Sequence, residues 1–528
     1  MNDNDNENEE WTIQGYQEIY EDVDDFQEYD NMVVEQERAV KEELPEVILK
    51  FIKSAEEVSH FNAIPAGAGF LAILGNICKN FVHIPNGRNH EDVRLHFCWI
   101  QTSGTGKSTL WLFVGKVADS VWAKINENGT HPAYITTVNH PDESSEQITI
   151  RGKFDTFSVV DYTDSALVGK YYKQLNTDGD NSEAFELKRR AGLLEGNGLA
   201  HWDEFEYSGI FNQSTHQEKA IVYLNKFMNS LAGGENWVIE KSLDSMEGKL
   251  MKCFCQRSIF ATTYPPKNVN EVMADKGVLQ RMLLYIREVP AYKQHEMRIK
   301  QYGKAGTIED TDTPVEEFAN DLYEIYKLLQ IRYMEVEMEH GDKAPLHVME
   351  YSEDYSDAIT QAYKQLINEL FGTRKEVKKL ASTFVSRIMI TLMKVATLCS
   401  IAEAPSLPKT KRFKVSSRNV RSAGLIVRQC YNTLVEWLER SLKHRKRGKG
   451  ASEHSLKLSA KDTYDNMQKD SKGFVNQAVF IQEWRKDIKK SKPQAYKIFR
   501  EQVNKDHNMF ELVKESRSWY IKLKEGEE

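Results

Sequence analysis

The order of apolar and polar residues predicts a central region in which strands and helices alternate. Residues 94–101 alternate at first and then become apolar, which is typical of a strand buried in a sheet. A short Gly/Ser/Thr loop follows, and Leu110-Trp-Leu-Phe-Val opens a helix. Similar apolar stretches are expected to be strands at residues 133–138, 157–161, 196–202, 257–263 and 282–286. This alternation indicates an α/β fold with a parallel sheet.

Helical patterns flank this region on both sides. Pro45 stands in the first turn of one expected helix. Residues 61–82 carry no charge before Lys79, but the stretch is short for a membrane span and leads directly into the first strand, so we expect a buried core helix. From Pro290 to about Leu442 the chain again reads as helical, with N-cap signals at the expected starts.

The last 70 residues have the pattern of a winged helix. Residues 476–486 place apolar side chains on one face of a helix. A second helix begins at Ser491, with a proline in its first turn and several basic residues, as a recognition helix would. Residues 510–523 read as two alternating strands around a polar turn. Such a module binds DNA or another protein, and these residues leave both possibilities open.

The charge is unevenly distributed along the chain. The net charge of the 528 residues is −9, yet residues 440–528 contain 22 Lys/Arg and 13 Asp/Glu and so carry +9. This asymmetry favours a C-terminal part that faces nucleic acid. No apolar run is long enough to predict a membrane span, and the six cysteines lack metal-binding spacing. We therefore expect a cytoplasmic protein (in the host cytoplasm if it is viral) with no membrane partner and no zinc.

The loop after the first strand has the layout of a phosphate-binding P-loop. Strand, glycine loop, Gly-Lys-Ser and helix follow one another, so that backbone N–H groups would surround the phosphates of ATP. Lys107 would reach the β- and γ-phosphates, and Ser108 would ligate Mg²⁺. The strict pattern has Gly where this chain has Gln101, which is tolerable because the later residues form the loop; the alternative is a chance Gly-Lys-Ser. The expected nucleotide-binding residues are Ser103, Gly104, Thr105, Gly106, Lys107, Ser108 and Thr109.

An acidic pair follows about a hundred residues later, at the end of an apolar strand. Asp203 would hold the water ligands of Mg²⁺, and Glu204 would polarise the attacking water. The alternative is a solvated loop. Thr262 or Thr263, at the end of a later strand, would sense the γ-phosphate, unless they are ordinary strand-end threonines.

Two arginines are candidates for stabilising phosphate charge. Arg281 stands immediately before an apolar strand, where it could be displayed at a subunit edge and complete a neighbour's site. Arg387, on a strongly amphipathic helix, could act as a second sensor of the γ-phosphate. For both, the alternative is an exposed arginine without a catalytic role.

Basic residues near the C-terminus are candidates for contacts with the DNA backbone. The run from His444 to Gly450 reads as a flexible basic linker that attracts phosphates without reading sequence. The expected DNA-binding residues are Arg445, Lys446, Arg447, Lys490, Lys492, Lys497 and Arg500.

The order of these motifs over roughly residues 45–440 resembles the P-loop helicase-like domains of phages, archaeal viruses and mobile elements, which often lie beside a primase. It is also similar to the minichromosome-maintenance branch of AAA+ helicases, with Thr262 or Thr263 in place of the usual sensor asparagine. The resemblance implies an AAA+/RecA-like parallel sheet, a helical lid and a ring-forming, hexameric DNA motor. No primase module is present in the sequence, so priming activity is not implied.

Together these patterns predict six parts of the chain. They are an acidic disordered tail (1–44), a helical N-terminal segment (45–94), a P-loop ATPase core (95–290), a helical lid (291–442), a basic linker (443–458) and a winged-helix domain (459–528).

The function that we expect is an ATP-dependent DNA motor, a replicative helicase of a virus or mobile element. ATP and Mg²⁺ are its expected cofactors. Its expected partners are single-stranded or forked DNA, further copies of the chain, and a primase or replication initiator. One alternative is a regulatory DNA-binding switch controlled by ATP. The other is a DNA-packaging ATPase, but large terminases carry a nuclease domain after the motor, and the C-terminal module here is too small for one.

Overall fold

The computed structural model describes most of the chain between Glu43 and Lys524. The described residues are 38, 43–59, 63–128, 134–139, 145–150, 153–159, 167–175, 185–205, 218–231, 241–242, 250–251, 255–265, 277–289, 291–303, 312–404, 413–448, 460–461, 463–487, 492–504, 510–515 and 518–524. The predicted acidic tail lies almost entirely outside them. Contacts divide the chain into two compact units, Met1–Glu439 and Arg440–Glu528.

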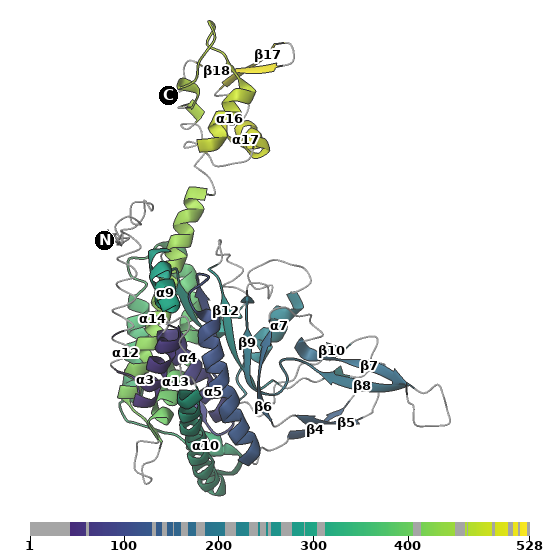
Figure 1. The fold of residues 1–528 in the computed structure, drawn as a ribbon, viewed down its shortest axis with the longest axis vertical. Helices are drawn as coiled ribbons and strands as arrows, with labels where there is room; N and C mark the ends of the chain where they lie inside the picture. Colours follow the sequence, from purple (N-terminus) through teal and green to yellow (C-terminus); the bar gives the residue numbers. More distant parts are fainter. Residues whose placement is uncertain are drawn as a thin grey trace, which may run out of the picture. The chain divides into compact units, whose positions relative to one another are not determined.

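The first unit is built on a five-stranded sheet in the order β13-β3-β12-β9-β6 (Figure 1). Every neighbouring pair in it is parallel, which confirms the α/β prediction. Strand β12 lies between β3, which leads into the glycine loop, and β9, which ends before the acidic pair. The strands are β3 (Phe97–Gln101), β6 (Phe154–Val159), β9 (Asn197–Trp202), β12 (Ser258–Thr263) and β13 (Leu283–Arg287).

Helix α4 (Ala63–Cys78) is the central core helix, and every one of its residues is buried. It lies against the sheet and against α5 (Lys107–Asn128), the helix after the glycine loop. Gly75 is required because a Cβ there would stand 2.6 Å from the backbone oxygen of Val93. Helix α4 contains no charged residue because it is packed closely against the rest of the protein on all sides.

Further helices cover α4 and α5 from outside. Phe51 of α3 (Glu46–Ser59) contacts aromatic rings from three other helices, Phe70 of α4, Phe113 of α5 and Phe318 of α10. The remaining helical elements of this unit are η3 (Leu279–Arg281), α7 (Glu218–Phe227), α9 (Ala291–Gly303), α10 (Asp312–His340), η4 (Gly341–Lys343), α11 (Ala344–His347), α12 (Tyr355–Asn368), α13 (Lys375–Ala402) and α14 (Ser417–Gly448).

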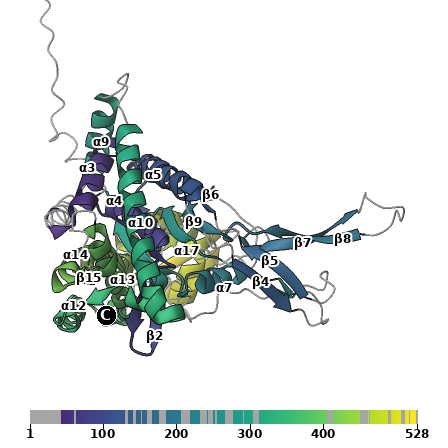
Figure 2. The same cartoon turned by 90° about the horizontal axis from the view of Figure 1, so that it is seen from below.

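Several short ribbons complete the unit, and two of them project from the sheet away from the helical side (Figures 1 and 2). The stretch predicted as a strand at residues 133–138 is a strand, but it pairs antiparallel with β5 and does not join the parallel sheet. The ribbons are β1 (His83–Asn86) with β2 (Asn89–Asp92), β4 (Tyr134–Asn139) with β5 (Ser145–Ile150), β7 (Gly169–Leu175) with β8 (Phe185–Ala191), β10 (Lys241–Ser242) with β11 (Leu250–Met251), and β14 (Glu350–Tyr351) with β15 (Lys414–Val415).

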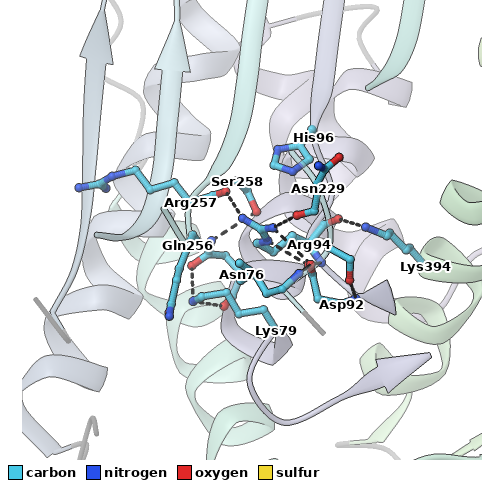
Figure 3. A network of polar contacts seen from close by, with 12 residues as sticks. Asn76, Lys79, Asp92, Arg94, His96, Asn229, Gln256, Arg257, Ser258 and Lys394 are labelled. Carbon is cyan, nitrogen blue, oxygen red and sulfur yellow. Dashed lines mark hydrogen bonds and ion pairs between the residues drawn. The ribbon is translucent and has the colours of Figure 1, made fainter. Parts of the chain in front are cut away.

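A buried polar network fastens the amino-terminal edge of the sheet (Figure 3). Arg94 is 1% exposed and forms an ion pair with Asp92, Nε to Oδ1 at 2.9 Å. Its guanidinium also donates to four backbone carbonyls, including those of Asn229 at 2.8 Å and Arg257 at 3.3 Å. Arg94 thus joins the start of β3 to the end of α7 and the start of β12.

The helices of the predicted lid belong to the same compact unit as the sheet. Helix α10 lies along α5, where Lys116 pairs with Asp312 at 3.3 Å and Lys124 pairs with Glu316. Helix α13 contacts α4, β1 and η3. Of the described helices, α13 is the one long and apolar enough to cross a membrane, yet 72% of its apolar stretch is buried within the protein, as in a core helix.

The second unit has a helix–strand–helix–helix–hairpin order with a three-stranded antiparallel sheet, β16-β18-β17. Its small core includes Phe480, Trp484, Phe499 and Phe510. The predicted basic linker starts too early, because α14 continues to Gly448 through Leu, Lys and Arg residues that favour helix. The elements are β16 (Val475–Asn476), α16 (Gln477–Asp487), α17 (Lys492–Ile498), the π-helical η6 (Phe499–Val503), β17 (Phe510–Glu515) and β18 (Ser518–Leu523).

Candidate functional site

The glycine loop has the backbone geometry of an anion nest. Gly104 and Gly106 have φ angles of 72° and 80°, a conformation that side-chain-bearing residues rarely adopt. Helix α5 begins directly afterwards at Lys107, so the N–H groups of its first turn face the loop. Ser108 is exposed at this helix start. Alternating loop dihedrals and a helix N-terminus together make an anion-binding concavity.

The side chains of Lys107 and Gln101 are held by residues of β3 and of the glycine loop. The Lys107 ammonium group donates to the carbonyl oxygens of Gln101 at 2.6 Å and Thr102 at 3.1 Å, so it lies beside the nest. Gln101 is the last residue of β3, buried, and its side chain accepts a hydrogen bond from the Trp99 indole N–H at 2.8 Å. Since Gln101 has no positive φ, glycine is not needed there. This explains why the departure from the P-loop pattern is structurally harmless.

The acidic pair lies at the same carboxyl-terminal edge of the sheet as the glycine loop. Trp202 is in register with Ala261, and Thr262 is in register with Trp99, so Asp203 is about level with Trp99, two residues before the end of β3. Neighbouring strands lie about 4.8 Å apart, which puts β9 about 10 Å from β3. The loop and the acidic pair can therefore face one bound group.

The backbone at the acidic pair is strained. Glu204 has a φ of 50°, and it is the one described residue other than glycine with a positive φ. Its N–H donates to Asp203 Oδ1 at 3.0 Å. Such a conformation costs about 1–3 kcal/mol and concentrates at functional sites. Both carboxylates are partly exposed, so they are accessible to a ligand.

The structure distinguishes between the two strand-end threonines. Thr262 donates a hydrogen bond to Asp203 Oδ1 at 2.8 Å. Thr263 is the next residue on the same strand, so its side chain points to the opposite face of the sheet. Of the two, Thr262 is the one that faces the acidic pair.

A buried histidine, not anticipated as a site residue, extends this contact. His201 Nε2 lies 3.3 Å from Thr262 Oγ1, and His201 Nδ1 lies 2.6 Å from Ser158 Oγ. Burial lowers the pKa of His201 to about 4, so its ring is neutral at pH 7. The Thr262 hydroxyl donates its hydrogen to Asp203, so its oxygen accepts a hydrogen bond from the His201 Nε2–H. His201 Nδ1 in turn accepts a hydrogen bond from the Ser158 hydroxyl. The hydrogen bonds thus run in one direction, from Ser158 to Asp203.

His201 also contacts the helix that starts at the glycine loop. Its ring stacks on Trp111 of α5, with centroids 4.1 Å apart and an interplanar angle of 15°. The chain Ser158–His201–Thr262 therefore spans β6, β9 and β12 and is packed against α5. A polar residue in an otherwise apolar strand, two positions before the acidic pair, was the sequence signal for it.

Two further residues lie at the loop and were not predicted. The Lys107 ammonium group is 4.5 Å from the centroid of the Tyr264 ring. Arg298 of α9 lies over Gly104, so closely that a Cβ there would be 3.2 Å from its guanidinium. The segment just before α9 is attached to the glycine loop, because the Val289 N–H donates a hydrogen bond to Thr102 Oγ1 at 3.0 Å. Arg298 is exposed, and its position in the fold, not a sequence motif, reveals it.

The structure does not bring Arg281 or Arg387 to the glycine loop of their own chain. Both line a cavity with Leu95 and His96, which precede β3, whereas Lys107 follows β3. Five strand residues separate the two edges, about 17 Å. Arg281 donates to Asn229 Oδ1 at 3.0 Å and to two other oxygens, so it is held within its chain. Arg387, predicted as a second sensor of the γ-phosphate, lies on α13, which packs against η3 and β1 at the far edge, so it stands away from the glycine loop of its own chain.

The predicted DNA contacts are only partly described. Lys492 and Lys497 of α17 and Arg500 of η6 are exposed on one short helical stretch. The backbone of Arg445, Lys446 and Arg447 is helical, as part of α14. Lys490 lies outside the described residues.

Metal ligands were predicted from one hydroxyl and one carboxylate, Ser108 and Asp203. Among the described residues no group of three or more His, Cys, Asp or Glu could hold a metal ion. A Mg²⁺ bound with a triphosphate needs no such group, because phosphate oxygens and water supply most ligands. Five of the cysteines are described; all five are buried, and none of them forms a disulfide.

Comparisons with known proteins add no family to this geometry. No protein-family model matches the chain, and no curated protein matches it significantly.

Proposed function

We propose that this chain is an ATP-driven DNA motor built on a P-loop core, a ring-forming replicative helicase of a virus or mobile element. The observation that carries the proposal is the strand order. One strand, β12, separates the strand of the glycine loop from the strand of the acidic pair, and its Thr262 contacts Asp203. This arrangement supports an ATPase with a polar residue between the phosphate-binding and water-activating groups.

The residues of the site fit a magnesium triphosphate. The positive-φ glycines and the start of α5 offer N–H groups to the phosphates. Lys107 would leave its two carbonyl partners for the β- and γ-phosphates, and Arg298 would reach the same phosphates from α9. Ser108 and Asp203 would hold Mg²⁺, which neutralises phosphate charge. Glu204 would orient and polarise the attacking water.

The second unit supports a DNA-binding role. Its element order and its β16-β18-β17 sheet support a winged helix, in which α17 would be the recognition helix. The exposed Lys492, Lys497 and Arg500 would contact phosphates there. Additional copies of the chain, and a primase or replication initiator, are the partners that a replicative role requires.

An ATP-controlled DNA-binding switch is the second candidate. Arg281 is half-buried and bonded within its own chain. That position gives no direct support to an arginine offered to a neighbouring subunit. A switch would bind ATP and DNA but would displace no strand from a forked substrate.

ATP hydrolysis by variants of the full chain tests the proposal. Lys107→Ala and Glu204→Gln are expected to lower turnover at least 100-fold, because each removes a group that acts on the transferring phosphate or the water. Lys116→Ala, a lysine on the same helix that pairs with Asp312 at the surface, is the matched control and should retain turnover. Normal turnover by Lys107→Ala would refute the nucleotide site.

Mixing variants tests whether the site is shared between copies. Arg281→Ala alone is expected to bind ATP but not to hydrolyse it. A mixture of Lys107→Ala and Arg281→Ala chains should regain activity, because some interfaces then combine an intact Lys107 with an intact Arg281. Full activity of the Arg281→Ala chain alone, together with no strand displacement by the wild type, would favour the switch.

A further inference from the structure

A small cavity lies at the amino-terminal edge of the sheet, on the opposite side from the glycine loop. Its volume is about 30 Å³, more than the roughly 10–15 Å³ that one water molecule requires. Besides Arg94, which is paired with Asp92, its lining includes Arg281 of η3, Arg387 and Lys394 of α13, and His96 just before β3. We call this space the basal cavity.

His96 presents an unsatisfied donor in the basal cavity. Its Nδ1 accepts a hydrogen bond from the Ile259 N–H at 3.1 Å. Burial holds the pKa of His96 well below its usual value, and the nearby charges of Arg94 and Lys394 act in the same direction, so the neutral ring carries its proton on Nε2. That N–H has no partner, and the residue is only 3% exposed. A buried donor without an acceptor costs about 1–3 kcal/mol.

The charges around the cavity are also uncompensated. The Arg281 guanidinium donates to three neutral oxygens, of Asn225, Asn229 and Gly277. Burial lowers the pKa of Arg281, and the positive charge of Arg387 lowers it further. Among the described residues, no carboxylate forms an ion pair with either arginine.

The other cation and the carboxylates nearby do not change this balance. Lys394 is 8% exposed and its ammonium group is 3.3 Å from the Arg94 carbonyl oxygen. Asp92 is already paired with Arg94. Glu91 is the one further carboxylate that lines the cavity. Three cations thus face one unpaired acid.

We propose that the basal cavity binds a phosphate-class oxyanion, one tetrahedral group held by Arg281, Arg387, Lys394 and the His96 N–H. Guanidinium groups match the oxygens of phosphate, and the oxyanion supplies the acceptor that His96 lacks. The cavity is too small for a nucleotide base or sugar. This site does not depend on the proposed nucleotide site, from which the height of the sheet separates it.

Phosphate binding by the full chain carrying Lys107→Ala tests the proposal. The Lys107→Ala substitution weakens phosphate binding at the glycine loop. It also weakens nucleotide binding to neighbouring copies of the chain, whose phosphates could otherwise be mistaken for the ligand of the basal cavity. Titration calorimetry with inorganic phosphate, at constant ionic strength in chloride, should show one site per chain. Arg387→Gln in this background is expected to weaken it at least tenfold. Lys379→Gln, which removes the same charge from an exposed position of α13, should leave it unchanged.

Two additional measurements protect the result against a folding defect. Arg281→Gln, on a different element, is expected to weaken phosphate binding as Arg387→Gln does, with melting temperatures near that of the parent. The ¹⁵N–¹H signal of His96 Nε2 should shift on saturation with phosphate. Absence of binding in the Lys107→Ala chain, or equal binding by the Arg387→Gln and Lys379→Gln variants, would overturn the proposal.

Discussion

Replacing Thr262 by valine separates the role of the hydrogen-bond chain from simple packing. Valine has nearly the shape of threonine, so the buried strand β12 keeps its fit, and only the hydroxyl is lost. Asp203 then loses the donor at 2.8 Å and keeps the Glu204 N–H at 3.0 Å. The His201 Nε2–H loses its acceptor. One substitution therefore changes both the carboxylate and the chain behind it.

The size of the effect follows from these two losses. A hydrogen bond to a charged acceptor contributes about 1.5–3 kcal/mol. If Asp203 needs that bond to hold its position in the transition state, turnover should fall about 10- to 150-fold, since about 1.4 kcal/mol corresponds to a factor of ten. The unpaired His201 N–H should lower the free energy of unfolding by about 1–3 kcal/mol.

Steady-state ATP hydrolysis as a function of Mg²⁺ concentration, with nucleotide affinity measured separately, provides the assay. Thr262→Val should lose turnover while ATP affinity changes little, and Thr262→Ser should restore most of it. Thr263→Val, on the opposite face of the strand, is the matched control. If Thr262→Val turned over ATP within twofold of Thr262→Ser, the hydrogen-bond chain would have no part in positioning Asp203.

Two other substitutions test residues that the structure singles out. Arg298→Gln should weaken ATP binding about three- to tenfold, a modest effect because the side chain is exposed, while Lys293→Gln on the same helix should not; equal affinities would place Arg298 outside the site. Arg94→Met should lower the free energy of unfolding in urea by about 3–5 kcal/mol, because it leaves the Asp92 carboxylate buried without its partner. Adding Asp92→Asn should recover part of that loss, and a further decrease would contradict the ion-pair explanation.

The sequence predicted the strands of the sheet and the glycine loop well because each has a strong local signal. Buried parallel strands are short apolar runs, and the loop needs glycines and a helix start at fixed spacing. The stretch at residues 134–139 has the same alternation as a sheet strand, yet it forms the β4–β5 ribbon. Alternation of apolar and polar residues predicts a strand, but which other strand it pairs with depends on contacts between residues distant in sequence.

The same limit explains the arginines. The periodicity around Arg387 correctly predicts a helix, now seen as α13, but does not say which edge of the sheet the helix crosses. Arg298 reaches the glycine loop because β13 ends beside β3 and α9 follows at once. The period-two alternation of a strand places Thr262 and Thr263 on opposite faces of the sheet, and this can be predicted from the sequence. That Thr262 lies beside Asp203 follows only from the register of β12 against β9, which the sequence does not show.

The sheet has distinct chemistry at its two edges, and this constrains any coupling between them. The glycine loop, Asp203 and Glu204 lie at the carboxyl edge, and Arg281 and Arg387 line the basal cavity at the amino edge. Since about 17 Å of strand separates the edges, no single phosphate group can touch both within one chain. An effect of Arg281 or Arg387 on ATP turnover must therefore act through another copy of the chain or through the elements that Arg94 fastens. The Arg94→Met variant alters only the second route, so its turnover in mixed assemblies would show which route operates.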